Sequence, residues 1–321
     1  MHPPRQRGAR VARRAVHGVL LLDKPLHLSS TQALGRAKWL LRAEKGGHTG
    51  TLDPLATGVL PLCFGAATKF SQMHLEADKS YEATLCLGQT TATGDAEGEV
   101  LRRRPVPVLT PDDLQQLAQR FTGRIAQVPP MYSALKQDGK PLYEYARAGE
   151  VRERPAREVT IHDLRLSPGA SAEVLHLSVR CSKGTYVRTL AEDIGEALSC
   201  GAHLSALRRV GTGGFSIGQC ITLEALEAMS ERERVAQLHG TDILLPQDHA
   251  IVLSNDEAGR FLSGLRRRGD WPDQALVAVW GDRPRALLGS AHVKAGELIP
   301  TRLLSPLDIE QTLAQVANTI D

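Results

Sequence analysis

The sequence lacks a long uncharged apolar run, which argues against a membrane-spanning helix. The longest uncharged stretch near the central motif, residues 54–68, is interrupted by two prolines and two glycines, whereas a span needs about 20 apolar residues in succession. Residues 1–16 carry five arginines and no acid, but only the apolar residues 19–22 follow before the next charge. That stretch is too short for a secretory signal. We therefore expect a cytoplasmic protein with no membrane attachment.

Paired cysteines and a large excess of one charge are also missing. The five cysteines lie far apart and form no Cys-x-x-Cys pair, so neither a disulfide framework nor a zinc site is indicated, and buried free thiols are expected. The formal net charge of +3 is too small to establish a nucleic-acid partner. The arginines are clustered, however, and such a cluster can either bind RNA phosphates or form a solvated surface. The clusters lie at residues 5–14, 102–104, 152–157, 208–209 and 266–268.

The periodicity of the chain predicts an α+β fold. Apolar and polar residues alternate over 81–87 and 174–181, which is typical of strands with one buried face in an antiparallel sheet. Thr110 precedes a proline and two acids, the signature of a helix start. A second helix is predicted from Val187, where apolar residues recur at helical spacing.

The chain of 321 residues is long enough for more than one domain. We expect a flexible basic arm over 1–16 and a main domain over 17–248. Within it, residues 124–157 are rich in Pro, Gly, Arg and Tyr with little periodicity, and long loops of this kind are usually functional or disordered. Short segments separated by glycines predict a small β-rich module over 251–321.

The run over 47–61 places a single carboxylate, Asp53, in a glycine-rich turn between apolar segments. Glycines at 47, 50 and 58 allow backbone angles closed to other residues and close approach of another molecule. Pro54 disfavours helical geometry at Asp53. Asp53 is therefore expected on a loop, where it either caps the turn through an Asx hydrogen bond or is presented to a substrate.

This run and four further segments resemble the motifs of one family, in the family's order. The segments are residues 18–25, 47–61, 79–83, 181–190 and 207–215. Together they are similar to the TruB family, bacterial tRNA pseudouridine synthases that isomerise one uridine of the T-loop. The resemblance implies the pseudouridine synthase fold, with a mixed and mainly antiparallel sheet. It also implies a mobile insertion at about 124–157 that closes over the tRNA stem-loop, and a C-terminal PUA-like RNA-binding domain.

The resemblance assigns the central chemistry to three residues. It makes Asp53 the catalytic carboxylate, Arg188 the arginine that pairs with Asp53 and holds it ionised, and Tyr81 the aromatic residue that stacks on the target base. Read without the family, Arg188 could be an exposed helix residue, and Tyr81 could be a core tyrosine at the head of a strand.

Other residues receive supporting roles from the same resemblance. Leu207 matches a residue that packs around the base, although alone it would be ordinary core. His48 matches a histidine that fills the gap left by the extruded uridine, although a loop histidine is usually a surface group. Tyr186 can line the pocket, and Asp95 can contact RNA or cap a turn. His27 stands where the family usually has glycine, which puts the local turn geometry in question.

The resemblance implies a tRNA pseudouridine-55 synthase that flips its base, needs no metal or other cofactor, and binds the T-arm stem-loop. It would act as a monomer without an obligatory protein partner, with room for a tRNA chaperone role. A guide-RNA-dependent enzyme of the dyskerin type shares the Asp53 motif, but the insertion and the absence of a lysine-rich tail argue against it. A non-catalytic RNA chaperone is a second alternative. A phosphate-binding loop at 47–50 is disfavoured because the Gly-Lys-Ser/Thr ending is absent.

Overall fold

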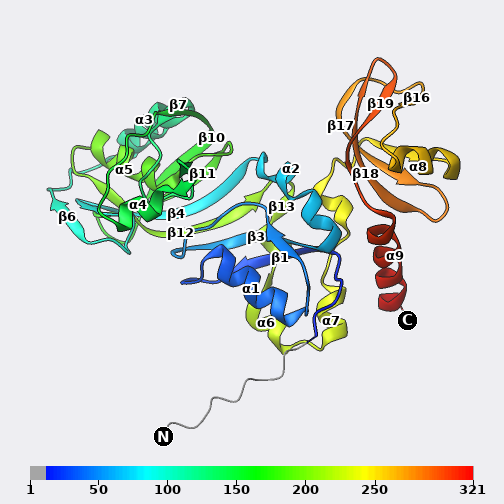
Figure 1. Ribbon diagram of the computed structural model, residues 1–321. Helices are drawn as coiled ribbons and strands as arrows, with labels where there is room; N and C mark the ends of the chain where they lie inside the picture. The colour runs from blue at the N-terminus through cyan, green and yellow to red at the C-terminus, as the bar shows by residue number, and fades with distance from the viewer. Residues whose placement is uncertain (1–11, 321) are drawn as a thin grey trace, which may run out of the picture.

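The computed structural model describes residues 12–320, which form an elongated molecule with a large and a small β-sheet unit side by side (Figure 1). The large sheet has ten strands and the small one five. The α+β fold with a β-rich C-terminal domain is thus confirmed. Over this described range, no helix combines the length and apolar character needed to cross a membrane.

The large sheet is mixed and mainly antiparallel, as predicted. Its order is β14-β1-β3-β12-β4-β11-β10-β7, with β2 beside β3 and β13 beside β12. Only the β1–β14 and β3–β12 pairs are parallel. The strands are β1 (Gly18–Lys24), β2 (Gly46–His48), β3 (Ala56–Phe64), β4 (Lys79–Leu87), β7 (Gly123–Gln127), β10 (Arg157–Pro168), β11 (Val174–Cys181), β12 (Ala202–Thr212), β13 (Phe215–Ser216) and β14 (Ile221–Thr222).

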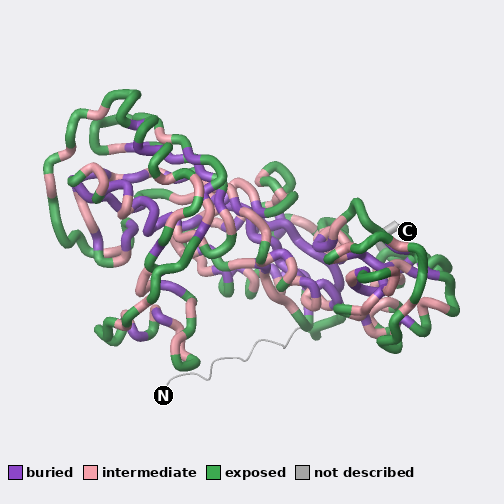
Figure 2. Tube along the Cα trace, turned by 90° about the horizontal axis from the view of Figure 1, so that it is seen from above, coloured by how far each residue is buried: buried purple, intermediate pink, exposed green. Residues whose placement is uncertain are grey.

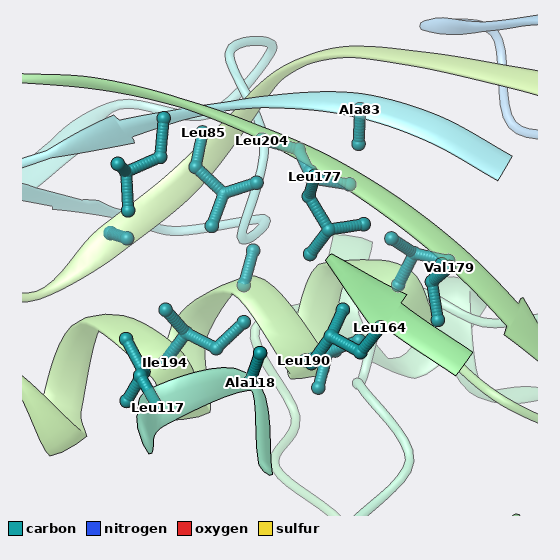
Figure 3. Close-up of a cluster of buried hydrophobic side chains, with 14 of the residues drawn as sticks. Ala83, Leu85, Leu117, Ala118, Leu164, Leu177, Val179, Leu190, Ile194 and Leu204 are labelled. Atoms are coloured by element: carbon teal, nitrogen blue, oxygen red, sulfur yellow. The ribbon is translucent and has the colours of Figure 1, made fainter. Parts of the chain in front are cut away.

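One half of this sheet is covered by α3 (Pro111–Phe121) and α5 (Val187–Ala197). The alternation predicted for β11 is complete, because every second side chain is buried. On β4 it holds for Ala83, Leu85 and Leu87, whereas Tyr81 is half-buried. Thr110 caps α3 with its hydroxyl, as its sequence indicated. Figure 3 shows the resulting core, in which leucines of the strands face apolar residues of the two helices.

The other half is covered by α1 (Ser30–Leu40) and α6 (Leu223–Ala228), which pack on β1 and β3 in a second core. Tyr81 on β4 and Leu207 on β12 contact both cores. Because the two helical layers are separate, these residues mark a seam between them. Figure 2 shows the buried stretches running through both sheet units, with exposed chain at the outer loops.

The C-terminal unit is held against the large sheet by shared packing. Its sheet has the order β15-β17-β18-β19-β16, and Ala278, Leu287 and Leu304 join a core with Val19 and Phe70. Its elements are β15 (Ala250–Leu253), α8 (Asn255–Leu262), β16 (Arg267–Arg268), β17 (Gln274–Gly281), β18 (Ala286–Lys294), β19 (Glu297–Leu303) and α9 (Pro306–Ile320).

The arm and the insertion differ in part from expectation. Residues 1–11 of the predicted flexible arm lie outside the described residues. Arg14, however, is paired with the main domain, because its main-chain N–H donates to Arg42 and its carbonyl accepts from Glu44. In the insertion, residues 124–127 belong to β7, and a short hairpin and helix follow. The remaining elements are α2 (Ser71–Leu75), β5 (Gln89–Thr91), β6 (Val100–Arg103), β8 (Lys136–Gln137), β9 (Lys140–Pro141), α4 (Leu142–Arg147), α7 (Glu231–Ala236) and the 3₁₀ turns at 65–69, 217–219 and 241–244.

The unusual residue His27 keeps the turn that glycine would make. Its φ is 67°, in the left-handed region that L residues adopt at a cost, and its main-chain N–H donates to the carbonyl of Pro54 at 2.9 Å. The turn after β1 is therefore tied to the loop that carries Asp53.

This strained backbone predicts that His27→Gly raises the free energy of unfolding. Relief of the left-handed strain, about 1–2 kcal/mol, outweighs the extra entropy of an unfolded glycine, about 0.5–1 kcal/mol. Urea denaturation should show a net gain of roughly 0.5 kcal/mol. His249→Gly is the matched control, because His249 is exposed and has no positive φ; it should lose stability. A loss in both variants would contradict the strain argument.

Candidate active site

Asp53 lies on the loop between β2 and β3, and its carboxylate points away from its own turn. The turn is closed by the main chain, since the Ala56 N–H donates to the Asp53 carbonyl at 3.0 Å. The carboxylate instead pairs with Arg188, with 2.9 Å between Oδ2 and Nη2. The Asx-cap interpretation is therefore wrong. At Gly58, φ is 103° and a Cβ would lie 2.1 Å from the Arg209 carbonyl oxygen, so only glycine lets β3 approach β12 here.

Arg188, the second residue of α5, is 5% exposed, which contradicts the reading of it as a surface residue. Besides Asp53, its guanidinium donates to the carbonyls of Thr93 at 2.9 Å and Tyr132 at 2.6 Å. Asp95 Oδ2 lies 3.6 Å from Nη1. Four acceptors from three segments of the chain thus fix the planar guanidinium in one orientation.

Asp95 does more than cap its turn. It is 3% exposed, and its Oδ1 accepts from the Thr93 hydroxyl at 2.5 Å and the Glu97 N–H at 3.1 Å. These bonds leave Oδ2 facing Arg188. Glu192, one turn later on α5, also interacts electrostatically with Arg188. Burial raises the pKa of Glu192 to about 7, although the charge of Arg188 opposes this shift. In the sequence, only the Thr-Gly-Asp turn at 93–95 points to Asp95, and this turn does not predict a contact with Arg188.

The surroundings raise the pKa of Asp53. The largest cause is removal of the carboxylate from water, and the nearby Asp95 carboxylate raises the pKa further. The pairing with Arg188 and the charge of Lys24 both lower the pKa of Asp53. Lys24 is fully buried and donates to the carbonyls of Pro25 at 2.8 Å and Leu28 at 2.6 Å. Burial lowers the pKa of Lys24 to about 8. Although 40% of the Asp53 side chain is exposed, it opens into a cavity rather than onto a convex surface.

That cavity, of about 360 Å³, lies at the seam between the two cores and is walled by the loop of Asp53, β4, β12, the start of α5 and the insertion. Five of the six predicted site residues line it: Asp53, Tyr81, Tyr186, Arg188 and Leu207. The sixth, His48, does not. It pairs with Leu62 on the edge strand β2, burial lowers its pKa, and its Nδ1 is buried with no hydrogen-bond partner among the described residues.

Arg209 is a residue of the cavity that sequence reasoning did not identify. The 208–209 cluster is expected either to bind RNA phosphates or to form a solvated surface, but Arg209 is 1% exposed and fits neither expectation. It donates to the Val59 carbonyl at 2.7 Å, and its neighbourhood includes the Tyr81 hydroxyl, whose pKa is raised by burial. Arg208 meanwhile pairs with Asp23 at 2.7 Å. Arg209 is therefore a buried part of the cavity wall, fixed to β3 by its bond to Val59.

The insertion closes one side of the cavity. Ser133, Ala134 and Leu135 line it, and the carbonyl of Tyr132 binds Arg188. Within the part of the chain that the structure describes, no group of three or more His, Cys, Asp or Glu residues is placed to hold a metal ion. The cysteines are free thiols as predicted, although Cys86 and Cys220 are only half-buried.

Comparison with known proteins gives the same family from independent matches. Residues 38–187 match the model described as TruB family pseudouridylate synthase (N terminal domain), and residues 188–252 match the tRNA pseudouridylate synthase B C-terminal domain. The protein named tRNA pseudouridine synthase B from Verminephrobacter eiseniae is 60% identical over 319 residues, covering 97% of this chain and 96% of that one. The protein of the same name from Cupriavidus metallidurans is 56% identical over 307 residues, covering 93% and 97%.

Solved structures show the same fold at lower identity. The chain matched in the crystal structure of a Cbf5-Nop10-Gar1 complex has a TM-score of 0.67 and 24% identity, covering 91% of this chain and 86% of that one. The family resemblance seen in the sequence is confirmed by the two family models and by the named relatives. This chain belongs to the TruB family of pseudouridylate synthases.

Proposed function

We propose that this protein is a tRNA pseudouridine-55 synthase that isomerises the T-loop uridine, with Asp53 as its catalytic carboxylate. The observation that carries the proposal is the pairing of Asp53 with the buried Arg188 at 2.9 Å inside a cavity. Relatives at 56–60% identity bear the name tRNA pseudouridine synthase B, which supports tRNA as the substrate class.

The isomerisation requires few protein groups beyond the pair of Asp53 and Arg188. The bond from C1′ to N1 breaks, the base rotates, and C1′ joins C5; the hydrogen on C5 is lost to solvent and N1 gains one, so the reaction needs no oxidant or cofactor. Asp53 can act either as the nucleophile or as the base that starts glycal formation. In both routes its ionised oxygen must face the ribose, and Arg188, which is itself bound to the carbonyls of Thr93 and Tyr132, holds the Asp53 carboxylate in place.

The size and lining of the cavity favour a single everted nucleotide. A volume of about 360 Å³ is at the lower end for ligand pockets, so a uridine would have to leave its stack to enter. Tyr81 and Leu207 would pack against the base, and Tyr186 would line the entrance. His48 lies off the cavity wall, where it could fill the gap that the flipped base leaves in the RNA.

The remaining parts of the chain would bind the rest of the RNA. We assign the catalytic unit to residues 17–248, with the insertion at about 124–157 closing over the T-arm stem-loop. Residues 251–321 would form a PUA-like RNA-binding domain. We expect the enzyme to act as a cytoplasmic monomer without an obligatory protein partner, with an additional tRNA chaperone role.

Activity of the purified chain alone tests this proposal. A T-arm stem-loop carrying tritium at uridine C5 should release it to water, because C5 loses its hydrogen when C1′ bonds to it. Release without any other protein or guide RNA would separate this enzyme from the guide-dependent dyskerin type. RNA binding without release would favour a non-catalytic chaperone.

The raised pKa of Asp53 predicts the acid side of the pH profile. The reaction needs the ionised carboxylate, so the rate should fall as pH drops through the pKa of Asp53. Because burial raises that pKa, the fall should be centred above the ordinary aspartate value. Single-turnover rates between about pH 4 and pH 8 measure it. A rate still unchanged at the ordinary aspartate pKa, with the protein folded, would contradict the assignment.

A further inference from the structure

Gln127 makes two hydrogen bonds that have no part in the chemistry described above. It is the last residue of β7 and is 2% exposed. Its Oε1 accepts from the main-chain N–H of Tyr186 at 3.0 Å, and its Nε2 donates to the Tyr186 carbonyl at 3.3 Å. One buried amide thus binds both main-chain polar groups of a single residue in another element.

The residue it binds is the one that begins α5. Tyr186 is the N-cap of this helix and provides no side-chain cap, and the first turn contains no acid. Helix starts leave main-chain N–H groups without partners, and Ser, Thr, Asp or Asn at the cap usually compensates. Here the contact to the helix start comes from β7, where Gln127 binds the main-chain N–H and carbonyl of the cap residue itself.

The position of this helix start matters because Tyr186 and Arg188 both line the cavity. The preceding turn contains Gly184 with φ of 79°, which by itself restricts the chain little. β7 is fixed by pairing with β10 up to Gln127. Gln127 is therefore held by the sheet itself. Its position does not depend on the loop that begins at residue 128.

We propose that Gln127 is a positioning residue for the isomerisation: it anchors the first turn of α5 to the sheet so that Arg188 meets Asp53 in the reactive orientation. This inference rests on the proposed function for its kinetic consequence. Its structural consequence, that residues 184–190 are ordered by Gln127, does not depend on the proposed function.

Gln127→Met tests the anchor, because methionine has similar length and volume but makes neither bond. A small misplacement of a catalytic group can cost up to about 100-fold in rate, so we expect the single-turnover rate to fall by about 10-fold or more. Affinity for the T-arm stem-loop should stay within about 2-fold, because the Gln127 side chain is 2% exposed and cannot contact a bound RNA. Leu117→Ala, in the same core on α3, is the control: it should lower thermal stability and leave the rate of the folded protein unchanged.

Hydrogen exchange followed by mass spectrometry provides a readout without activity. In Gln127→Met, peptides covering residues 184–190 should exchange faster, while the later turns of α5 stay protected. Unchanged exchange there would overturn the proposal, as would faster exchange with a wild-type rate. An equal loss of rate in Leu117→Ala would overturn it too. If the unaltered chain makes no pseudouridine, the proposed function fails, and the exchange result still decides whether Gln127 anchors the helix.

Discussion

Asp53→Asn should abolish pseudouridine formation while leaving tRNA binding nearly intact. Asparagine keeps the shape of the side chain but has no negative charge, so it can act neither as nucleophile nor as base. Loss of an essential group of this kind lowers the rate by about 10⁴-fold or more. Single-turnover assays with T-arm RNA, together with filter binding of the same RNA, measure the two effects separately.

Asp163→Asn is the matched control for this substitution. Asp163 is on β10 with 51% of its side chain exposed, and its carboxylate lies 3.3 Å from the exposed Arg165, so its loss should leave both rate and affinity unchanged. Parallel losses of activity, RNA affinity and thermal stability in Asp53→Asn would instead make Asp53 a folding residue.

Arg188→Lys should have the second-largest effect, a fall in rate of about 10²–10³-fold, or about 2.7–4 kcal/mol in transition-state stabilisation. Lysine keeps the charge, but its compact ammonium cannot reproduce the fork of a guanidinium. It cannot reach Asp53 and the carbonyls of Thr93 and Tyr132 together. Single-turnover kinetics on the folded variant test this.

The pH profile of the same variant provides a further check. Arg188 lowers the pKa of Asp53 against the effect of burial, so weakening the pair should move the acid fall of the rate to higher pH. Arg180→Lys is the control, because Arg180 is exposed and pairs with Asp78 at 3.4 Å. An Arg188→Lys enzyme with an unshifted acid fall would show that Arg188 does not hold Asp53 ionised.

Local patterns in the sequence predict the elements of the fold well. The cap at Thr110 and the alternation over β4 and β11 are decided by neighbouring residues, and the structure has them as expected. The position of Asp53 on a loop also follows locally, from the glycines and Pro54. Which helices share one face of the sheet does not follow, because it depends on the strand order.

The environment of the site depends on contacts between distant segments. Arg188 binds Thr93 and Tyr132, which lie 95 and 56 residues away in the chain, and no local pattern predicts such contacts. Arg209 was placed wrongly for a similar reason, since a pair of arginines looks the same whether exposed or buried. The family resemblance supplied the pairing of Asp53 with Arg188, but not the roles of Asp95 or Lys24.

Mapping pseudouridine at single-nucleotide resolution in unmodified tRNA tests the central claim most directly. After incubation with the purified chain alone, we expect modification at the T-loop uridine at position 55, and none with Asp53→Asn bound to the same tRNA. A tRNA that is bound but unmodified by the unaltered chain, or modified equally by Asp53→Asn, would contradict the account.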